Sequence, residues 1–563
     1  MKTSYLYRSI VCVAALAIGF ASCKRYLEVE PISSFGSDYV FDNVVNAQKA
    51  VLGAYAPLTG DQGYGIRISM YYPYDEDNMM GQGGTPYPDN ERRDIAHYNA
   101  KPSNTQLAAP FNQLYSGIER ANICIYNIPR MEKYAAGTEA EKKELRRLHG
   151  EVLVLRAQYY LELIRNWGDV PAQFLPSSLE TDLFKPKMDR DSIYNVLLDD
   201  LATAAGLLPW RTEVAADERI TQGAARALRA RIALYRGGYS LRRNRKMERG
   251  SNHKTYYQIA RDECDAIMKR PDQHKLNPSY MSVFKDYICA HRIEPNGEVI
   301  WEVAMGGGTS ALGDSKMGYY NGPRWNNLGN SALTILPNYF YMFDSTDTRR
   351  DVTVAPYNVN QNGTLAGRTL QTLVDGKFRR DWITNPVMLT SNAQYFGLNW
   401  PMIRFSDVLL MFAEAENELN NGPTAAAKAA FEQVRLRAFG GDASLIGTTP
   451  STYQEFFDAI VKERALEFGS EGIRKYDLIR WNLLKTKLDE TKALLAVMAA
   501  RSAAPWNTYP TTMYFRTGQT TMQWAGSFYK PTVTPAPSGY TSVAWLGNGI
   551  TSTILTYYAV GFQ

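Results

Sequence analysis

Hydrophobic residues recur at helical spacing through much of the first half of the chain. In one segment they follow one another at steps of three or four residues, at Leu145, Leu148, Val152, Leu155, Tyr159 and Leu163. This spacing places them on one face of an α-helix. Gly168 and Pro171 come directly after the segment, where residues that end a helix are expected. The pattern therefore predicts a long amphipathic helix that buries one side.

Similar apolar stripes predict further helices before and after this one. Several of them stop at a proline or a glycine, as at Pro57, Pro209 and Gly237. The predicted helices cover residues 43–56, 111–128, 191–208, 224–237, 256–268, 405–419, 425–438, 453–468 and 473–484. Pairs of such helices with Ala, Leu and Tyr at packing positions resemble tetratricopeptide-like units, although the repeat spacing is irregular and the Trp-Leu-Gly-Tyr signature is absent.

The pattern changes between residues 271 and 400, where Gly, Asn, Pro and aromatic residues replace the helical stripes. Long loops of this kind are usually functional or disordered, and a high aromatic content argues against disorder. The sequence therefore predicts a mostly α protein with one domain over residues 23–563. A helical-pair scaffold occupies about 40–270 and 401–490, and an irregular loop-rich lobe occupies about 61–105, 271–400 and 491–563.

The first residues indicate export. Lys2 and Arg8 precede an apolar run over residues 10–20, which is too short to span a membrane and fits a secretory signal over residues 1–22. The run ends in Ala21-Ser22-Cys23, which resembles the lipobox of a bacterial lipoprotein. We expect cleavage before Cys23 and lipidation of that cysteine; the alternative is an ordinary signal peptide in which Cys23 has no role.

Composition narrows the class of partner. Removing Lys2 and Arg8 with the signal lowers the formal charge from +5 to +3, which argues against nucleic acid. Cys124, Cys264 and Cys289 leave room for one disulfide at most, and no framework of several. Aromatic residues make up 12% of the chain, with 37 tyrosines, and tyrosine suits polar ligands that have hydrophobic faces, such as sugars.

The sequence gives catalysis little support. A glycosidase needs two carboxylates at a set separation, and Asp75, Glu76 and Asp77 are acids near aromatics. Solvated loop acids or a calcium site explain that run better. Ser282 and Lys285 fit a Ser-x-x-Lys pattern whose companion motifs are absent. The five histidines are scattered, so we expect no transition-metal site, no cofactor and no enzyme.

The later helices carry a family resemblance. Residues 404–415 read RFSDVLLMFAEA, and 461–468 and 471–481 read VKERALEF and EGIRKYDLIRW. Together with YLEVEP at 26–31, RAQYY at 156–160, WGDVP at 167–171 and DTRR at 347–350, they strongly resemble the SusD/RagB family of Bacteroidetes surface glycan-binding lipoproteins. Glu463, Arg464, Glu467 and Arg474 within these motifs predict a charge network that locks helices together.

This resemblance implies a SusD-like fold and an outer-membrane, lipid-anchored, surface-exposed protein that captures oligosaccharide for a SusC-like TonB-dependent transporter. The same architecture binding peptides is the alternative. The implied site lies on loops of one face, and two aromatic loop regions supply its candidates. The ligand-binding candidates are Tyr74, Asn78, Tyr87, Tyr98, Tyr319, Tyr320, Arg324 and Trp325. The competing expectation is that these side chains are core residues that pin long loops.

Overall fold

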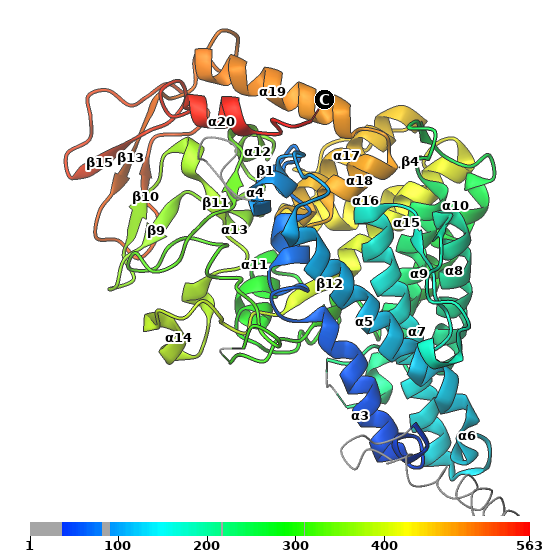
Figure 1. The fold of residues 1–563 in the computed structure, drawn as a ribbon. Helices are drawn as coiled ribbons and strands as arrows, with labels where there is room; N and C mark the ends of the chain where they lie inside the picture. Colours follow the sequence, from blue (N-terminus) through cyan, green and yellow to red (C-terminus); the bar gives the residue numbers. More distant parts are fainter. Residues whose placement is uncertain (1–36, 82–90, 216–217, 309, 563) are drawn as a thin grey trace, which may run out of the picture.

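A computed structural model describes residues 37–81, 91–215, 218–308 and 310–562. Helices account for 48% of the structure and strands for 9%, so the prediction of a mostly helical protein is confirmed. Figure 1 shows the long helices side by side in one half and a loop-rich lobe with short strands in the other. The predicted signal peptide, the predicted lipidation site Cys23 and the candidate Tyr87 lie outside the described residues.

The scaffold is a succession of helices, most of which pack against the next one in the series. Its members are α3 (Val44–Tyr55), α5 (Thr105–Asn127), α7 (Glu139–Trp167), α8 (Arg190–Leu207), α9 (Gln222–Gly237), α10 (His253–Met268), α15 (Phe405–Asn420), α16 (Ala425–Ala438) and α17 (Tyr453–Phe468). Thr138 and Glu141 form a capping box that starts α7, and Gly168 ends it at φ +78°.

The remaining α-helices of the described residues, most of them short, flank the scaffold and cross the lobe. They are α2 (Ser37–Val40), α4 (Glu91–Ala96), α6 (Glu132–Ala136), α11 (Tyr280–Ser282), α12 (Pro337–Phe340), α13 (Arg350–Thr353), α14 (Pro386–Thr390), α18 (Arg474–Arg480), α19 (Leu484–Ala500) and α20 (Ser552–Tyr557). In Figure 1, α19 runs from the scaffold across the top of the lobe.

Small antiparallel sheets hold the lobe together. One has the order β1 (Met79–Met80), β7 (Thr334–Ile335), β11 (Val374–Asp375), β8 (Val354–Ala355), and a second has β13 (Thr512–Arg516) between β14 (Trp524–Ala525) and β15 (Tyr540–Ala544). The two-stranded pairs are β6 (Val299–Val303) with β12 (Trp400–Arg404), β9 (Tyr357–Val359) with β10 (Leu365–Gly367), β2 (Val170–Pro171) with β3 (Lys187–Met188), and β4 (Ser240–Leu241) with β5 (Met247–Glu248). Because β12 runs directly into α15, the β6–β12 pair joins the lobe to the scaffold.

A buried charge network ties the last scaffold helices to the lobe. Glu463 accepts a hydrogen bond from Arg349 at 2.7 Å, and Arg464 pairs with Asp407 at 2.6 Å. Arg474 binds Asp77 at 2.6 Å. All of these side chains are buried, so the predicted network of charges between helices is confirmed.

Two helix boundaries differ from prediction. The predicted helix 473–484 is two helices, α18 and α19, separated at Asn482, which adopts φ +59°, and α19 continues to Ala500 into the segment predicted as loop. The helix predicted from 111 begins at Thr105, and Pro110 lies inside it. Pro110 is the sixth residue of this helix, past the four N–H groups that have no partner within it, so it removes one bond of the ladder near the N-terminal end.

The three described cysteines outside the N-terminus, Cys124, Cys264 and Cys289, are buried free thiols. Burial raises the pKa of the Cys124 thiol to about 12. These thiols therefore stay protonated at neutral pH and act as small apolar core residues.

Candidate functional site

Tyrosines from the two predicted loop regions meet at Arg92, on α4. Arg92 donates a hydrogen bond to the Tyr71 hydroxyl at 3.3 Å, and its guanidinium carbon lies 5.8 Å from the centre of the Tyr71 ring. The Tyr320 hydroxyl also interacts with Arg92. Two segments about 250 residues apart in the chain are thus joined through one guanidinium.

The turn that carries Tyr320 brings further groups to the same face. The backbone N–H groups of Tyr319 and Tyr320 both bond to the Lys316 carbonyl, at 3.2 and 3.1 Å. The Tyr319 and Tyr320 rings lie edge to face with their centres 5.1 Å apart. The Lys316 ammonium lies 4.8 Å from the centre of the Tyr395 ring. We refer to Tyr71, Arg92, Lys316, Tyr319, Tyr320 and Tyr395 as the tyrosine face.

Hydrogen bonds and charges fix this face. Asp61 accepts from Lys316 at 3.0 Å and from the Tyr395 hydroxyl at 3.1 Å. Burial raises the pKa of Tyr71, with the neighbouring Tyr320 adding to the shift, so the Tyr71 phenol remains a neutral donor. Partial burial acts against the charge of Lys316, but Asp61 and Tyr395 outweigh it and raise the pKa of that ammonium. The face thus combines phenol groups with the fixed cations Arg92 and Lys316.

Tyr74 and Asn78 lie in the interior instead of on this face. Tyr74 donates to the Ser470 carbonyl at 3.3 Å, and the Asn78 amide approaches the Ala465 carbonyl at 3.5 Å. Both side chains are almost completely buried. Their partners belong to α17 and the turn after it. Tyr74 and Asn78 therefore behave as core residues that hold a long loop in place.

The acidic run beside them is also internal. Asp75 bonds to the His97 ring at 2.6 Å and accepts from the Ala559 N–H at 2.6 Å. Glu76 accepts from the Asn78 N–H at 2.6 Å. The expectation that these acids are solvated is wrong, because protein donors occupy their oxygens. Within the described residues no group of three or more His, Cys, Asp or Glu side chains is placed to hold a metal ion.

Tyr98 is half-buried between the acidic run and the C-terminal segment. Its hydroxyl donates to the Asp75 carbonyl at 2.5 Å. Its ring packs edge to face against Phe562, with the centres 4.9 Å apart, and lies 4.1 Å from the Lys475 ammonium. These contacts occupy both its hydroxyl and its ring, so the structure places Tyr98 away from the tyrosine face.

Arg324 and Trp325 follow Tyr319 and Tyr320 along the chain but differ from each other in exposure. Arg324 is exposed and donates to the Asn330 carbonyl at 3.3 Å. Trp325 is 8% exposed and packs with Val359 and Leu365 of the β9–β10 hairpin. Tyr320 is equally exposed, at 8%, so each of these two rings offers a ligand only a small part of its surface, whereas Arg324 is free to reach one. Their roles as ligand-binding residues stay predictions.

The sequence did not single out Arg92, Lys316 or Tyr395 as site residues. Arg92 belongs to a run of charged residues, Glu91-Arg92-Arg93-Asp94, which looks like an ordinary solvated helix face. Lys316 stands three residues before Tyr319, and that closeness to an aromatic pair was the one local signal that pointed to it.

Comparisons with known proteins agree with this architecture. The SusD family matches residues 297–532, and a family described as starch-binding and associating with the outer membrane matches residues 25–234. SusD-like protein P25 of Formosa agariphila is 25% identical over 85% of this chain and 90% of its own length. SusD-like protein P38 of the same organism is 25% identical over 84% and 91%.

Solved structures share the fold. A SusD homolog from Bacteroides thetaiotaomicron is 23% identical and superposes over 82% of this chain and 90% of its own, with a TM-score of 0.73. Surface glycan-binding protein A from the same organism is 20% identical over 79% and 91%, with a TM-score of 0.61. A laminarin-binding SusD-like protein is 22% identical over 80% and 94%, with a TM-score of 0.62.

The prediction that the chain is not an enzyme is confirmed, because SusD-family glycan-binding proteins are non-catalytic. No helix among the described residues is both long and apolar enough to cross a membrane.

The two family matches follow one another along the chain and together cover most of it. This chain belongs to the SusD/RagB family.

Proposed function

We propose that the chain is a cell-surface lipoprotein that captures oligosaccharides on the tyrosine face and delivers them to a SusC-like TonB-dependent transporter of the outer membrane. The observation that carries the proposal is the meeting of Tyr71 and Tyr320 at Arg92. Support also comes from the relatives, among them a laminarin-binding SusD-like protein and a glycan-binding protein in complex with laminarihexaose.

The chemistry of the face suits sugars. A pyranose ring presents C–H bonds on its faces and hydroxyls around its edge. Half-buried tyrosines such as Tyr319 offer a flat apolar surface to the C–H faces of the sugar and a phenolic hydroxyl to its hydroxyl groups. Arg92 and Lys316 add charged donors, whose hydrogen bonds are stronger than those of neutral groups.

The place of action follows from the N-terminus. We infer that Cys23 carries the lipid and that the residues after it connect the lipid to α2, which begins at Ser37. Two or more acyl chains are enough for stable anchoring. Mass spectrometry of the mature protein should find an acylated Cys23; an unmodified N-terminus would remove the tether from this proposal.

Calorimetry tests the ligand class. The mature protein, titrated with laminarihexaose, other oligosaccharides and a panel of short peptides, should bind one or more of the sugars and none of the peptides. Binding of peptides alone would replace sugars with peptides as the cargo. Tyr39→Ala, which removes an exposed tyrosine on α2, is the matched control for tyrosine-face variants.

A further inference from the structure

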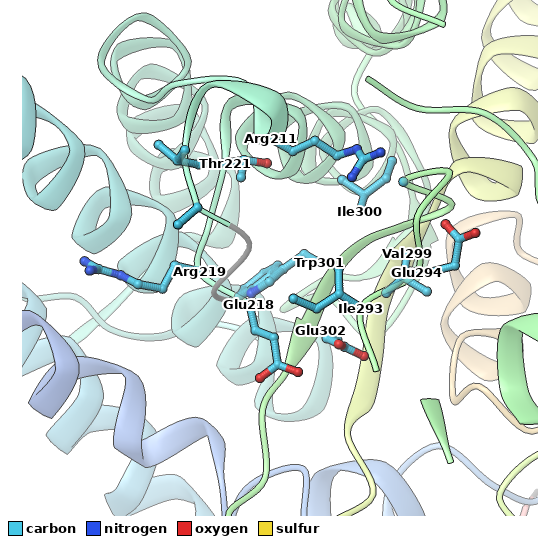
Figure 2. Close-up of a pocket in the computed structure, with 13 residues that line it drawn as sticks. Arg211, Glu218, Arg219, Thr221, Ile293, Glu294, Val299, Ile300, Trp301 and Glu302 are labelled. Atoms are coloured by element: carbon cyan, nitrogen blue, oxygen red, sulfur yellow. The ribbon is translucent and has the colours of Figure 1, made fainter. Parts of the chain in front are cut away.

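A small cavity lies between the loop that precedes α9 and the strand β6, and none of the tyrosine-face residues lines it. Its volume is about 80 Å³. A buried water needs on the order of 10–15 Å³ measured in this way, so the cavity has room for several waters or for part of a small ligand. Figure 2 shows Trp301 in its middle, with the carboxyl groups of Glu218 and Glu302 close together below the ring.

Two buried polar atoms in the lining have no hydrogen-bond partner among the described residues. They are the indole Nε1 of Trp301 and the hydroxyl of Thr221. Trp301 is 3% exposed and Thr221 is 8% exposed. A buried donor without a partner costs about 1–3 kcal/mol, so such groups are usually matched by a water or a ligand.

The carboxyl pair supplies acceptors beside these donors. Glu218 accepts from the Asn399 amide at 2.9 Å. Burial, helped by the neighbouring Glu218, raises the pKa of Glu302 to about 8. Glu302 is therefore mostly protonated at neutral pH. The His291 Nε2 lies 3.8 Å from Glu218, and Arg211, Arg219 and Glu294 are further ionisable residues in the lining.

We propose that this cavity is a second binding site, which takes the hydroxyl-bearing edge of a single sugar residue. The indole N–H would donate to a sugar oxygen, while the Thr221 hydroxyl and the carboxyl oxygens would take up neighbouring sugar hydroxyls. A bare cation does not fit the site as well, because an N–H donor lines it and the carboxyl pair holds a proton. The inference rests on the cavity and its unpaired atoms, and not on the tyrosine face.

The Trp301 indole proton gives a direct readout. In a transverse-relaxation-optimised ¹H–¹⁵N spectrum of the mature protein, each of the ten tryptophans contributes one indole resonance. Trp301→Phe keeps an aromatic ring but removes the N–H, and so identifies its resonance. We expect D-glucose or D-galactose, added to tens of millimolar, to shift this resonance along a saturating curve.

Thr221→Val, which has nearly the same shape, should weaken that response about fivefold or more. Thr203→Val, which changes an exposed threonine on α8, should leave it unchanged. An unmoved Trp301 resonance with both sugars would overturn the proposal and leave a cavity that holds water only. Tyr320→Phe separates the two sites, because it should weaken oligosaccharide binding without altering the Trp301 response. The two readouts are therefore independent: a loss of oligosaccharide binding tests the tyrosine face, and the Trp301 resonance tests the cavity.

Discussion

Arg404 donates one hydrogen bond to the Glu467 carboxylate at 2.8 Å and another to the Glu467 carbonyl at 3.1 Å, and both residues are fully buried. Arg349 and Arg437 also bind this carboxylate. Burial works against the charge of Glu467, but the three guanidinium groups outweigh it and hold the pKa of the carboxyl far below its usual range. One side chain of α17 thus connects three arginines from different parts of the chain, and other buried acids, among them Glu298 and Glu463, share in balancing their charge.

Glu467→Gln should lower the free energy of unfolding by about 3–5 kcal/mol, because removing one partner of a buried ion pair leaves the other charge uncompensated. Urea unfolding followed by circular dichroism measures this. The control is Asp489→Asn, which breaks an exposed pair with Lys485 on α19 and should change stability by less than about 1 kcal/mol. Equal effects of the two changes would show that the buried network does not hold the helices.

Glu302→Gln should stabilise the protein at alkaline pH. Folding raises the Glu302 pKa to about 8. Below pH 4.5 the carboxyl is protonated in both the folded and the unfolded state, so burying it costs no free energy of ionisation. As the pH rises, the unfolded state ionises first, and the resulting loss of folding stability reaches its full size above pH 8. The variant avoids this cost, so its advantage in unfolding free energy should be near zero at pH 4.5 and on the order of 5 kcal/mol at pH 9. An advantage independent of pH would mean that Glu302 is not buried in its charged form.

Gly117→Ala should destabilise the contact between α5 and α7. A Cβ at this position would lie 2.5 Å from the Tyr159 ring, which cannot retreat easily because its hydroxyl donates to the Ala54 carbonyl at 2.6 Å. Overpacking of this kind costs about 1–3 kcal/mol. Gly206→Ala, on α8, meets nothing within 4 Å and should be neutral or stabilise by up to about 1 kcal/mol. Thermal unfolding of both variants gives the comparison, and a Gly117→Ala protein as stable as the parent would contradict the packing.

Local patterns predicted the scaffold well, because a helix that packs on one side needs an apolar stripe and stop signals close by in the sequence. The helices 425–438 and 453–468 have the predicted ends to the residue. The break at Asn482 was missed because neither glycine nor proline marks it.

The site was harder to predict because its polar groups pair over long distances in the chain. Asp77 looked solvated in the sequence, but its partner Arg474 lies 397 residues away. Arg92 looked like a surface charge, but it lies between tyrosines of two loops. The aromatic turn that carries Tyr319 and Tyr320 could be found, because tyrosines in a Gly/Pro-rich loop are a local signal. Its partners across the face could not.

The affinity of tyrosine-face variants for an oligosaccharide tests the central claim most directly. Once the glycan panel has identified a ligand, calorimetry should find that Tyr320→Ala and Arg92→Ala each weaken its binding about tenfold or more, equal to about 1.4 kcal/mol. Tyr39→Ala should bind as the parent protein does, and circular dichroism should show all three variants folded. Parent-like affinity in both tyrosine-face variants would contradict the account and place oligosaccharide capture elsewhere on the molecule.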